Sequence, residues 1–111
     1  MCGIAGFYGA PPGARAERRA LLARMVGALA HRGPDERGLH LEDGVGLGHA
    51  RLSIVDIASG QQPMASDDGV VRLAFNGEIF NYVELRNELA ARGHRFRTDS
   101  DTEVILRLYE E

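Results

Sequence analysis

The 111-residue sequence has little of what several classes of protein depend on. It contains one cysteine, so an internal disulfide is excluded. No hydrophobic run approaches the roughly 18 residues that a membrane span needs, and no basic stretch leads into an apolar run as in a secretory signal. The net charge of −3 gives no general attraction to nucleic acid or to anionic membranes. We therefore expect a cytoplasmic protein without a nucleic-acid or membrane partner.

Metal and nucleotide motifs are missing as well. The four histidines lack zinc-ligand spacing, and a single cysteine does not make up for it. The phosphate-binding pattern GxxxxGK[ST] is absent. We expect no metal and no cofactor in this chain.

What is present is the composition of a small globular domain. The chain is 44% hydrophobic and 26% charged, which is typical of folded proteins rather than of disordered ones. Its length fits one domain, over residues 1–111, and leaves no room for two.

The first half of the chain predicts a strand, a helix and a hairpin. The run Gly3–Tyr8 is apolar and is followed by a turn-rich segment, which favours a buried strand. Between Arg15 and Ala30 the apolar residues fall on one helical face. Asp43-Gly44 then separates two strand-like runs, the signal of a hairpin. A further β-rich segment follows over Leu52–Ile57.

The second half predicts shorter elements. Val70–Phe75 is strand-like and Asn76-Gly77 marks a tight turn. Two capping boxes, Asn81 with Glu84 and Ser100 with Glu103, each predict a helix start.

The first of these helices is expected to run to about Arg92, with a return strand over His94–Arg97. The second carries an apolar stripe made of Val104, Ile105, Leu108 and Tyr109. The chain stops inside that stripe, so we expect a domain truncated at its C-terminal end. The mixed pattern predicts an α+β fold with a mostly antiparallel sheet.

Cys2 is the first candidate for chemistry. A lone cysteine is more often a small buried hydrophobe. Removal of Met1, expected before a small residue, would however leave Cys2 with a free α-amine. Such an amine, with an ordinary pKa of about 7.7–8.0 against about 8.5 for a thiol, can serve as the local base for its own thiol.

The order of the sequence blocks resembles that of the class II glutamine amidotransferases. Behind the opening Met-Cys-Gly-Ile-Ala-Gly, these blocks follow in the family's order: His31-Arg32-Gly33-Pro34-Asp35, Arg51-Leu52-Ser53-Ile54-Val55-Asp56, Gln62-Pro63, Asn76-Gly77-Glu78-Ile79-Phe80-Asn81-Tyr82 and Ser100-Asp101-Thr102-Glu103-Val104-Ile105. The HRGPD and RLSIVD blocks are similar to the branch of the glutamine-hydrolysing asparagine synthetases. The resemblance covers the whole chain.

The resemblance implies a catalytic set. Cys2 would attack the carboxamide of glutamine, release ammonia and form a γ-glutamyl thioester that water hydrolyses to glutamate. Asn76, through its side-chain amide, and Gly77, through its backbone N–H, match the family's oxyanion-hole positions. Read alone, Asn76-Gly77 is a hairpin turn, and we expect both roles together. His31 and Arg32 are expected to support the site without doing chemistry.

The resemblance also implies how glutamine is held. Arg51 matches the position that binds the α-carboxylate, for which a planar fork of donors is suited; by itself it reads as a surface arginine at a strand end. Leu52, Ser53, Ile54 and Val55 would form the pocket wall through main-chain groups. Glu78 and Asp101 match the acceptors of the α-ammonium, although Asp101 alone is also a favourable helix-start residue.

For the whole protein, the resemblance implies an αββα sandwich of the N-terminal nucleophile hydrolase type, present here only in its N-terminal portion. A C-terminal synthetase domain outside this chain would use ATP and Mg²⁺ to make asparagine with the released ammonia. Two alternatives stay open: a non-catalytic fragment that binds glutamine or a partner, and an amidotransferase with another acceptor carboxylate. Missing strands would leave an open sheet edge that invites association, including a homodimer.

Overall fold

The computed structural model describes residues 2–9, 13–52 and 59–111. Its elements are β1 (Gly3–Tyr8), α1 (Arg15–Gly27), β2 (Glu36–Glu42), β3 (Val45–Arg51), β4 (Met64–Ala65), β5 (Arg72–Leu73), α2 (Tyr82–Ala91) and α3 (Asp101–Glu110). Both sheets are antiparallel, so the predicted α+β class is confirmed. No helix among the described residues could cross a membrane.

The first half forms a regular sheet with one helix on it. Its strand order is β1-β3-β2, with Gly3 opposite Ala50 and Glu42 opposite Val45. The predicted hairpin is confirmed, and Gly44 makes its turn at a φ of 77° that glycine adopts without strain. Leu22 and Val26 of α1 are fully buried against the sheet.

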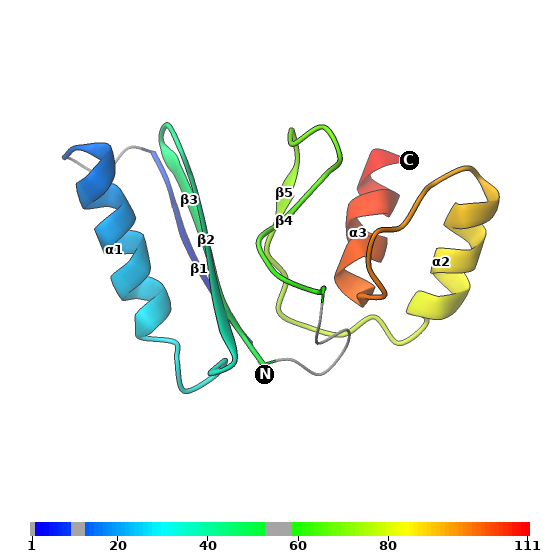
Figure 1. Cartoon of the computed structure of the whole chain (residues 1–111), viewed down its shortest axis with the longest axis horizontal. Helices are drawn as coiled ribbons and strands as arrows, with labels where there is room; N and C mark the ends of the chain where they lie inside the picture. Colours follow the sequence, from blue (N-terminus) through cyan, green and yellow to red (C-terminus); the bar gives the residue numbers. More distant parts are fainter. Residues whose placement is uncertain (1, 10–12, 53–58) are drawn as a thin grey trace.

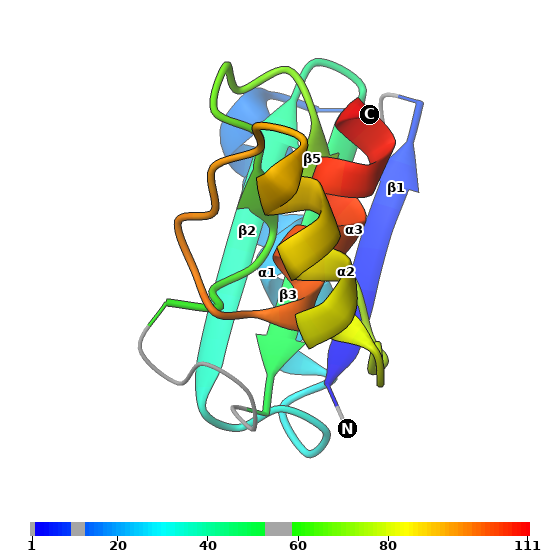
Figure 2. The same cartoon turned by 90° about the vertical axis from the view of Figure 1, so that its right-hand side faces the viewer.

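The second half is less regular. It contains a two-stranded sheet of β4 and β5, and the helices α2 and α3, which pack on each other. In Figure 1 the elements succeed one another as α1, the three-stranded sheet, β4 with β5, and then α3 and α2. Figure 2, seen from the side of α2, has α2 and α3 in front of the three-stranded sheet.

Several predictions for the second half are wrong. The strand expected over Val70–Phe75 shrinks to the two residues of β5, and no strand forms over His94–Arg97. Asn76-Gly77 is not a hairpin turn, because α2 rather than a strand follows it and Gly77 does not take a positive φ. Asn81 precedes α2 as expected, but its side chain makes no capping hydrogen bond.

The packing of α3 also differs from the predicted stripe. Its buried residues include Glu103, Val104, Leu106 and Arg107, whereas Leu108 and Tyr109 are 45% and 77% exposed. Ser100 caps the helix by accepting a hydrogen bond from the Thr102 N–H at 3.1 Å.

Glu103, however, does not reach back to Ser100 as a capping box requires. Its carboxylate accepts hydrogen bonds from the N–H groups of Arg97 and Thr98 and from the guanidinium of Arg107. Sequence periodicity counts apolar residues and does not detect a buried ion pair.

Candidate active site

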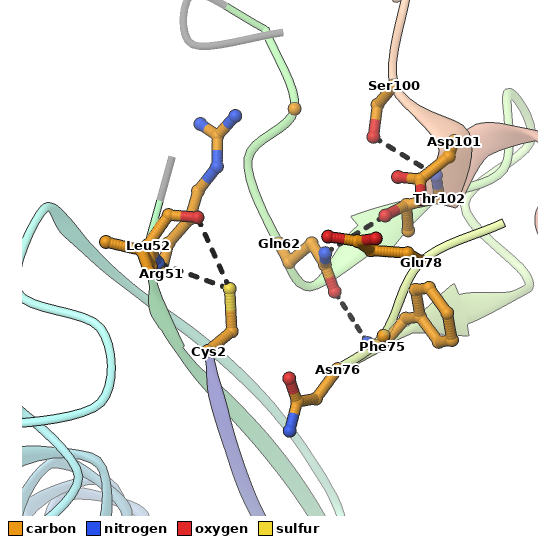
Figure 3. A pocket seen from close by; sticks show the side chains of 12 residues that line it. Cys2, Arg51, Leu52, Gln62, Phe75, Asn76, Glu78, Ser100, Asp101 and Thr102 are labelled. Atoms are coloured by element: carbon orange, nitrogen blue, oxygen red, sulfur yellow. Dashed lines mark hydrogen bonds between the residues drawn. The ribbon is translucent and has the colours of Figure 1, made fainter. Parts of the chain in front are cut away.

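Cys2 lies at the start of β1, beside the end of β3. Because Gly3 pairs with Ala50, the preceding cysteine meets the residues that follow Ala50. Its Sγ accepts a hydrogen bond from the Leu52 N–H at 3.2 Å and lies 3.5 Å from the Leu52 carbonyl oxygen (Figure 3). Arg32 donates from Nε to the Cys2 carbonyl oxygen at 3.1 Å. Sheet pairing and this arginine therefore fix the main chain of the candidate nucleophile.

The thiol opens on a pocket built from both halves of the chain. The first half contributes Cys2, Arg51 and Leu52, and the second contributes Gly60, Gln62, Phe75, Asn76, Gly77, Glu78, Ser100, Asp101 and Thr102. Figure 3 has Cys2 beside Arg51 and Leu52, with Gln62, Glu78 and Asp101 across from them. The pocket thus gathers residues that are up to a hundred positions apart in the sequence.

The segment of Asn76 and Gly77 follows β5, has no regular secondary structure and bends at Gly77, and both residues line this pocket. A Cβ on Gly77 would stand 2.8 Å from Cζ of the Phe75 ring, so the ring packs where another residue's side chain would begin. The Asn76 Oδ1 is buried and has no hydrogen-bond partner. These two residues are next to each other in the pocket wall, as the two donors of an oxyanion hole must be. The unpaired Oδ1 of Asn76 is an acceptor and would not itself bind an oxyanion.

Arg51 is not a surface residue. It is 4% exposed, and its Nη1 donates to Oε2 of Glu36 on the neighbouring strand at 3.0 Å. The guanidinium therefore enters the pocket already paired with a carboxylate. Sequence reasoning did not find Glu36, although the β2–β3 register sets it opposite Arg51.

Glu78 and Asp101 line the pocket in different ways. Glu78 is exposed, whereas Asp101 is 8% exposed at the start of α3. Asp101 Oδ2 accepts a hydrogen bond from the Ile79 N–H at 2.9 Å. The aspartate thus holds the chain just beyond Glu78. Three predicted wall residues, Ser53, Ile54 and Val55, lie outside the described residues, as does most of the β-rich segment Leu52–Ile57.

Two further residues support the pocket and were given no role by the sequence. Gln62 accepts from the Phe75 N–H at 2.6 Å and donates to Thr102 Oγ1 at 3.1 Å. His49 is fully buried on β3, and its Nε2 lies 3.1 Å from the Phe75 carbonyl oxygen. Burial lowers the pKa of His49, an effect that the Phe75 carbonyl partly opposes. The Gln62-Pro63 block was one signal for Gln62, but nothing in the sequence alone links either residue to Phe75.

The family profile and the individual relatives point to the same group of known proteins. The profile of the glutamine amidotransferase domain matches residues 1–111. Asparagine synthetase [glutamine-hydrolyzing] 1 of Bacillus subtilis is 46% identical over 110 residues, which are 98% of this chain and 17% of that relative. Asparagine synthetase [glutamine-hydrolyzing] 3 of Arabidopsis thaliana is 44% identical over 111 residues, 100% of this chain and 19% of that relative. The chain thus spans less than a fifth of the length of these two relatives.

Proposed function

Because this chain belongs to the glutamine amidotransferase domain family, we propose that it hydrolyses the side-chain amide of glutamine with Cys2 as nucleophile. The observation that carries the proposal is a cysteine at position 2 whose Sγ opens on a pocket lined by Asn76, Gly77, Glu78 and Asp101. A chain truncated within an αββα sandwich of the N-terminal nucleophile type accounts for the succession of helix, sheet, sheet and helices (Figure 1).

The reaction begins with removal of Met1, which frees the α-amine of Cys2. This amine takes the thiol proton, and the sulfur attacks the carboxamide carbon of glutamine. The proton then passes to the leaving nitrogen, the C–N bond breaks, and ammonia departs from a γ-glutamyl thioester. Water attacks the thioester, releasing glutamate and restoring the thiol.

The tetrahedral intermediates carry negative charge on the former amide oxygen. In this proposal the Asn76 amide N–H and the Gly77 backbone N–H donate to that oxygen. Neither group makes a hydrogen bond to another described residue. Donors positioned in advance act most strongly where charge develops, and loss of one typically costs roughly 100–1,000-fold in rate.

The α-groups of glutamine require charges of both signs. Arg51 supplies donors to the α-carboxylate while it stays paired with Glu36, and its burial limits competition from water. Asp101 and Glu78 accept from the α-ammonium, with one oxygen of Asp101 already used by Ile79. Leu52 completes the wall beside Cys2.

We further propose that the ammonia serves an ATP-dependent synthetase domain outside this chain, which makes asparagine from aspartate. The names of the relatives support this acceptor, and another acceptor carboxylate is the alternative. In this proposal ATP and Mg²⁺ serve that domain, in keeping with the synthetase names of the relatives.

A non-catalytic role is the second candidate. Several large apolar side chains are exposed in this chain, among them Phe80 at 91% and Tyr109 at 77%. Such side chains suit contact with the rest of a longer protein, with another partner or with a second copy. In that case the chain would bind but release no ammonia.

The test is ammonia release from glutamine by protein whose intact mass establishes that Met1 is absent. Cys2→Ala should reduce the release to background, because no other residue of the pocket can form the thioester. Protein that retains Met1 is a matched control with an unchanged pocket sequence and should also be inactive. Equal release by Cys2→Ala would refute the nucleophile. Release by neither form, together with thermal stabilisation by glutamine, would support the binding role instead.

A further inference from the structure

We propose that His49 and Gln62 are positioning residues for glutamine hydrolysis, which together hold Phe75 and thereby fix Asn76 and Gly77 beside Cys2. The inference rests on the function proposed above and assigns it two residues that do not touch the reacting atoms. Both main-chain polar groups of Phe75 are held: Gln62 accepts from its N–H at 2.6 Å, and His49 meets its carbonyl oxygen at 3.1 Å.

Gln62 uses both ends of its side chain. While Oε1 accepts from Phe75, Nε2 donates to Oγ1 of Thr102, which is 2% exposed at the start of α3 (Figure 3). An amide supplies one acceptor and one donor at this spacing without a change of charge. Gln62 therefore connects Phe75, which precedes Asn76 and Gly77, to α3, the helix that carries Asp101.

His49 holds the same residue from the three-stranded sheet. A carbonyl oxygen can only accept, so the Nε2 of His49 carries the proton and donates to Phe75. Burial lowers the pKa of the ring and favours its neutral form, in which Nδ1 is then an acceptor. That Nδ1 is buried without a partner. Leaving a buried polar atom unpaired costs stability, so the histidine is not explained by packing alone.

The contacts of His49 and Gln62 with Phe75 start from neighbouring positions at the β2–β3 pair. Gly38 of β2 is opposite His49 in the register, and a Cβ on Gly38 would stand 1.7 Å from the Gln62 carbonyl oxygen. Glycine here lets the backbone at Gln62 come directly against β2. His49, which donates to the Phe75 carbonyl, lies on β3, and Gln62, which accepts from the Phe75 N–H, lies against β2. The β2–β3 pair therefore positions both residues.

A third contact holds the other end of the segment. Asp101 accepts from the Ile79 N–H at 2.9 Å. Asn76, Gly77 and Glu78 therefore lie between a fixed Phe75 and a fixed Ile79. With no hydrogen bond of its own to another described residue, the Gly77 N–H is directed by these neighbours. Positioning of this kind supplies the preorganisation on which an oxyanion hole depends.

The experiment compares Gln62→Met and His49→Leu, which remove the contacts to Phe75, with the unchanged chain. We expect kcat to fall roughly 10- to 100-fold, less than for loss of a donor itself, while the KM for glutamine changes by less than about threefold. Gln61→Met makes the same chemical change at the adjacent, exposed glutamine and should leave kcat unchanged. His49→Gln keeps an N–H donor and should recover much of the lost rate.

A second measurement separates positioning from general damage. Glutamate γ-semialdehyde can accept the Cys2 thiol: the S–C bond forms, the thiol proton passes to the aldehyde oxygen, and that oxygen occupies the oxyanion hole. Its affinity should fall in the variants by about the same factor as kcat/KM. The affinity for glutamine, measured with Cys2→Ala added, should stay within about threefold. A semialdehyde affinity that does not change, or a loss confined to glutamine binding, would overturn the proposal.

Hydrogen exchange keeps this inference separate from the function on which it rests. If the unchanged chain hydrolyses no glutamine, the proposed function fails, and the contacts are judged by exchange alone. Amides over residues 74–80 should then exchange faster in Gln62→Met and His49→Leu, but not in Gln61→Met. Circular dichroism and the melting temperature establish that each variant is folded. Unchanged exchange in folded variants would refute the clamp on Phe75.

Discussion

Two regions, one of residues 2–9 and 13–52 and the other of residues 59–111, build the same pocket by different means. The first region is a hydrogen-bonded sheet under one helix, with Leu22 and Val26 fully buried between them. The second has a sheet of two short strands and an ion pair with both partners buried: Glu103 is 0% exposed and Arg107 is 3% exposed. Regular pairing holds the candidate nucleophile, whereas side-chain hydrogen bonds hold the candidate oxyanion hole.

The difference teaches where each part of the site is vulnerable. Cys2 is positioned by the register of β1 and β3, which many bonds share. Asn76 and Gly77 are positioned by a few individual side chains, so single substitutions there should act more selectively.

The largest change in stability is expected from removal of one partner of the buried ion pair. Arg107→Met leaves the Glu103 carboxylate buried without the guanidinium that donates to it at 2.9 and 3.1 Å. We expect the free energy of unfolding to fall by about 3–5 kcal/mol. Urea denaturation measures it. Arg92→Met, which breaks a surface pair with Glu111, is the control and should cost about 0–1 kcal/mol. Equal losses would contradict a charged core.

The two regions should also respond differently to acid. Burial raises the pKa of Glu103, but hydrogen bonds from Arg97, Thr98 and Arg107 outweigh it, so the folded-state pKa lies below the ordinary value of 4.5. Its contribution is present above about pH 4.5 and is lost as the pH falls through the folded-state pKa. The loss of unfolding free energy caused by Glu103→Gln, measured by urea denaturation, should therefore become smaller as the pH falls below about 4.5.

Leu22→Ala provides the matched change in the first region. Loss of a fully buried leucine should cost about 2–5 kcal/mol, and the deficit should not depend on pH over the same range, since no charge is involved. If the loss of unfolding free energy became smaller to the same extent in Leu22→Ala and Glu103→Gln, global acid unfolding rather than Glu103 would explain the pH dependence.

Arg51→Lys should have a smaller effect than the preceding substitutions, and it should act on substrate binding. Lysine keeps the charge but loses the fork of donors that can reach Glu36 and a carboxylate together. We expect the KM for glutamine to rise about tenfold, the loss of one charge-assisted hydrogen bond, while kcat changes little. Steady-state ammonia release measures both constants. An unchanged KM would assign the carboxylate of glutamine to another residue.

The smallest effect distinguishes the two helix starts of the second region. Ser100 accepts from the Thr102 N–H, whereas the Asn81 side chain caps nothing. Ser100→Ala should cost about 1 kcal/mol, and Asn81→Ala close to none. Thermal unfolding of the two variants side by side tests this. A larger loss for Asn81→Ala would mean that the capping box predicted from the sequence does form in solution.

The same contrast explains what could be predicted from the sequence. The strand Gly3–Tyr8 and the hairpin at Asp43-Gly44 depend on local patterns, and both form. The expected burial of the strand is wrong, because Ile4 is 50% and Tyr8 is 94% exposed. The segment His94–Arg97 reads as a strand, yet its Arg97 N–H bonds to the Glu103 carboxylate. A contact between a main-chain group and a charged side chain leaves no periodic signal, so patterns could not predict it.

For the site, the resemblance to a family pointed to residues that line one pocket, while the supporting contacts were not predictable. The pairing of Arg51 with Glu36 depends on strand register, and the contact of His49 with Phe75 depends on how the two regions meet. Neither can be inferred from spacing along the chain. The assigned roles of Cys2, Asn76 and Asp101 remain predictions.

The central claim is that Cys2 forms a covalent bond to the glutamyl group. Its most direct test is intact-mass spectrometry of Met1-processed protein mixed with glutamine and quenched in acid within the first turnover. We predict a γ-glutamyl adduct that peptide mapping assigns to Cys2, and none in Cys2→Ala. Ammonia release without an adduct on Cys2 at any quench time, or with an adduct on another residue, would contradict the account.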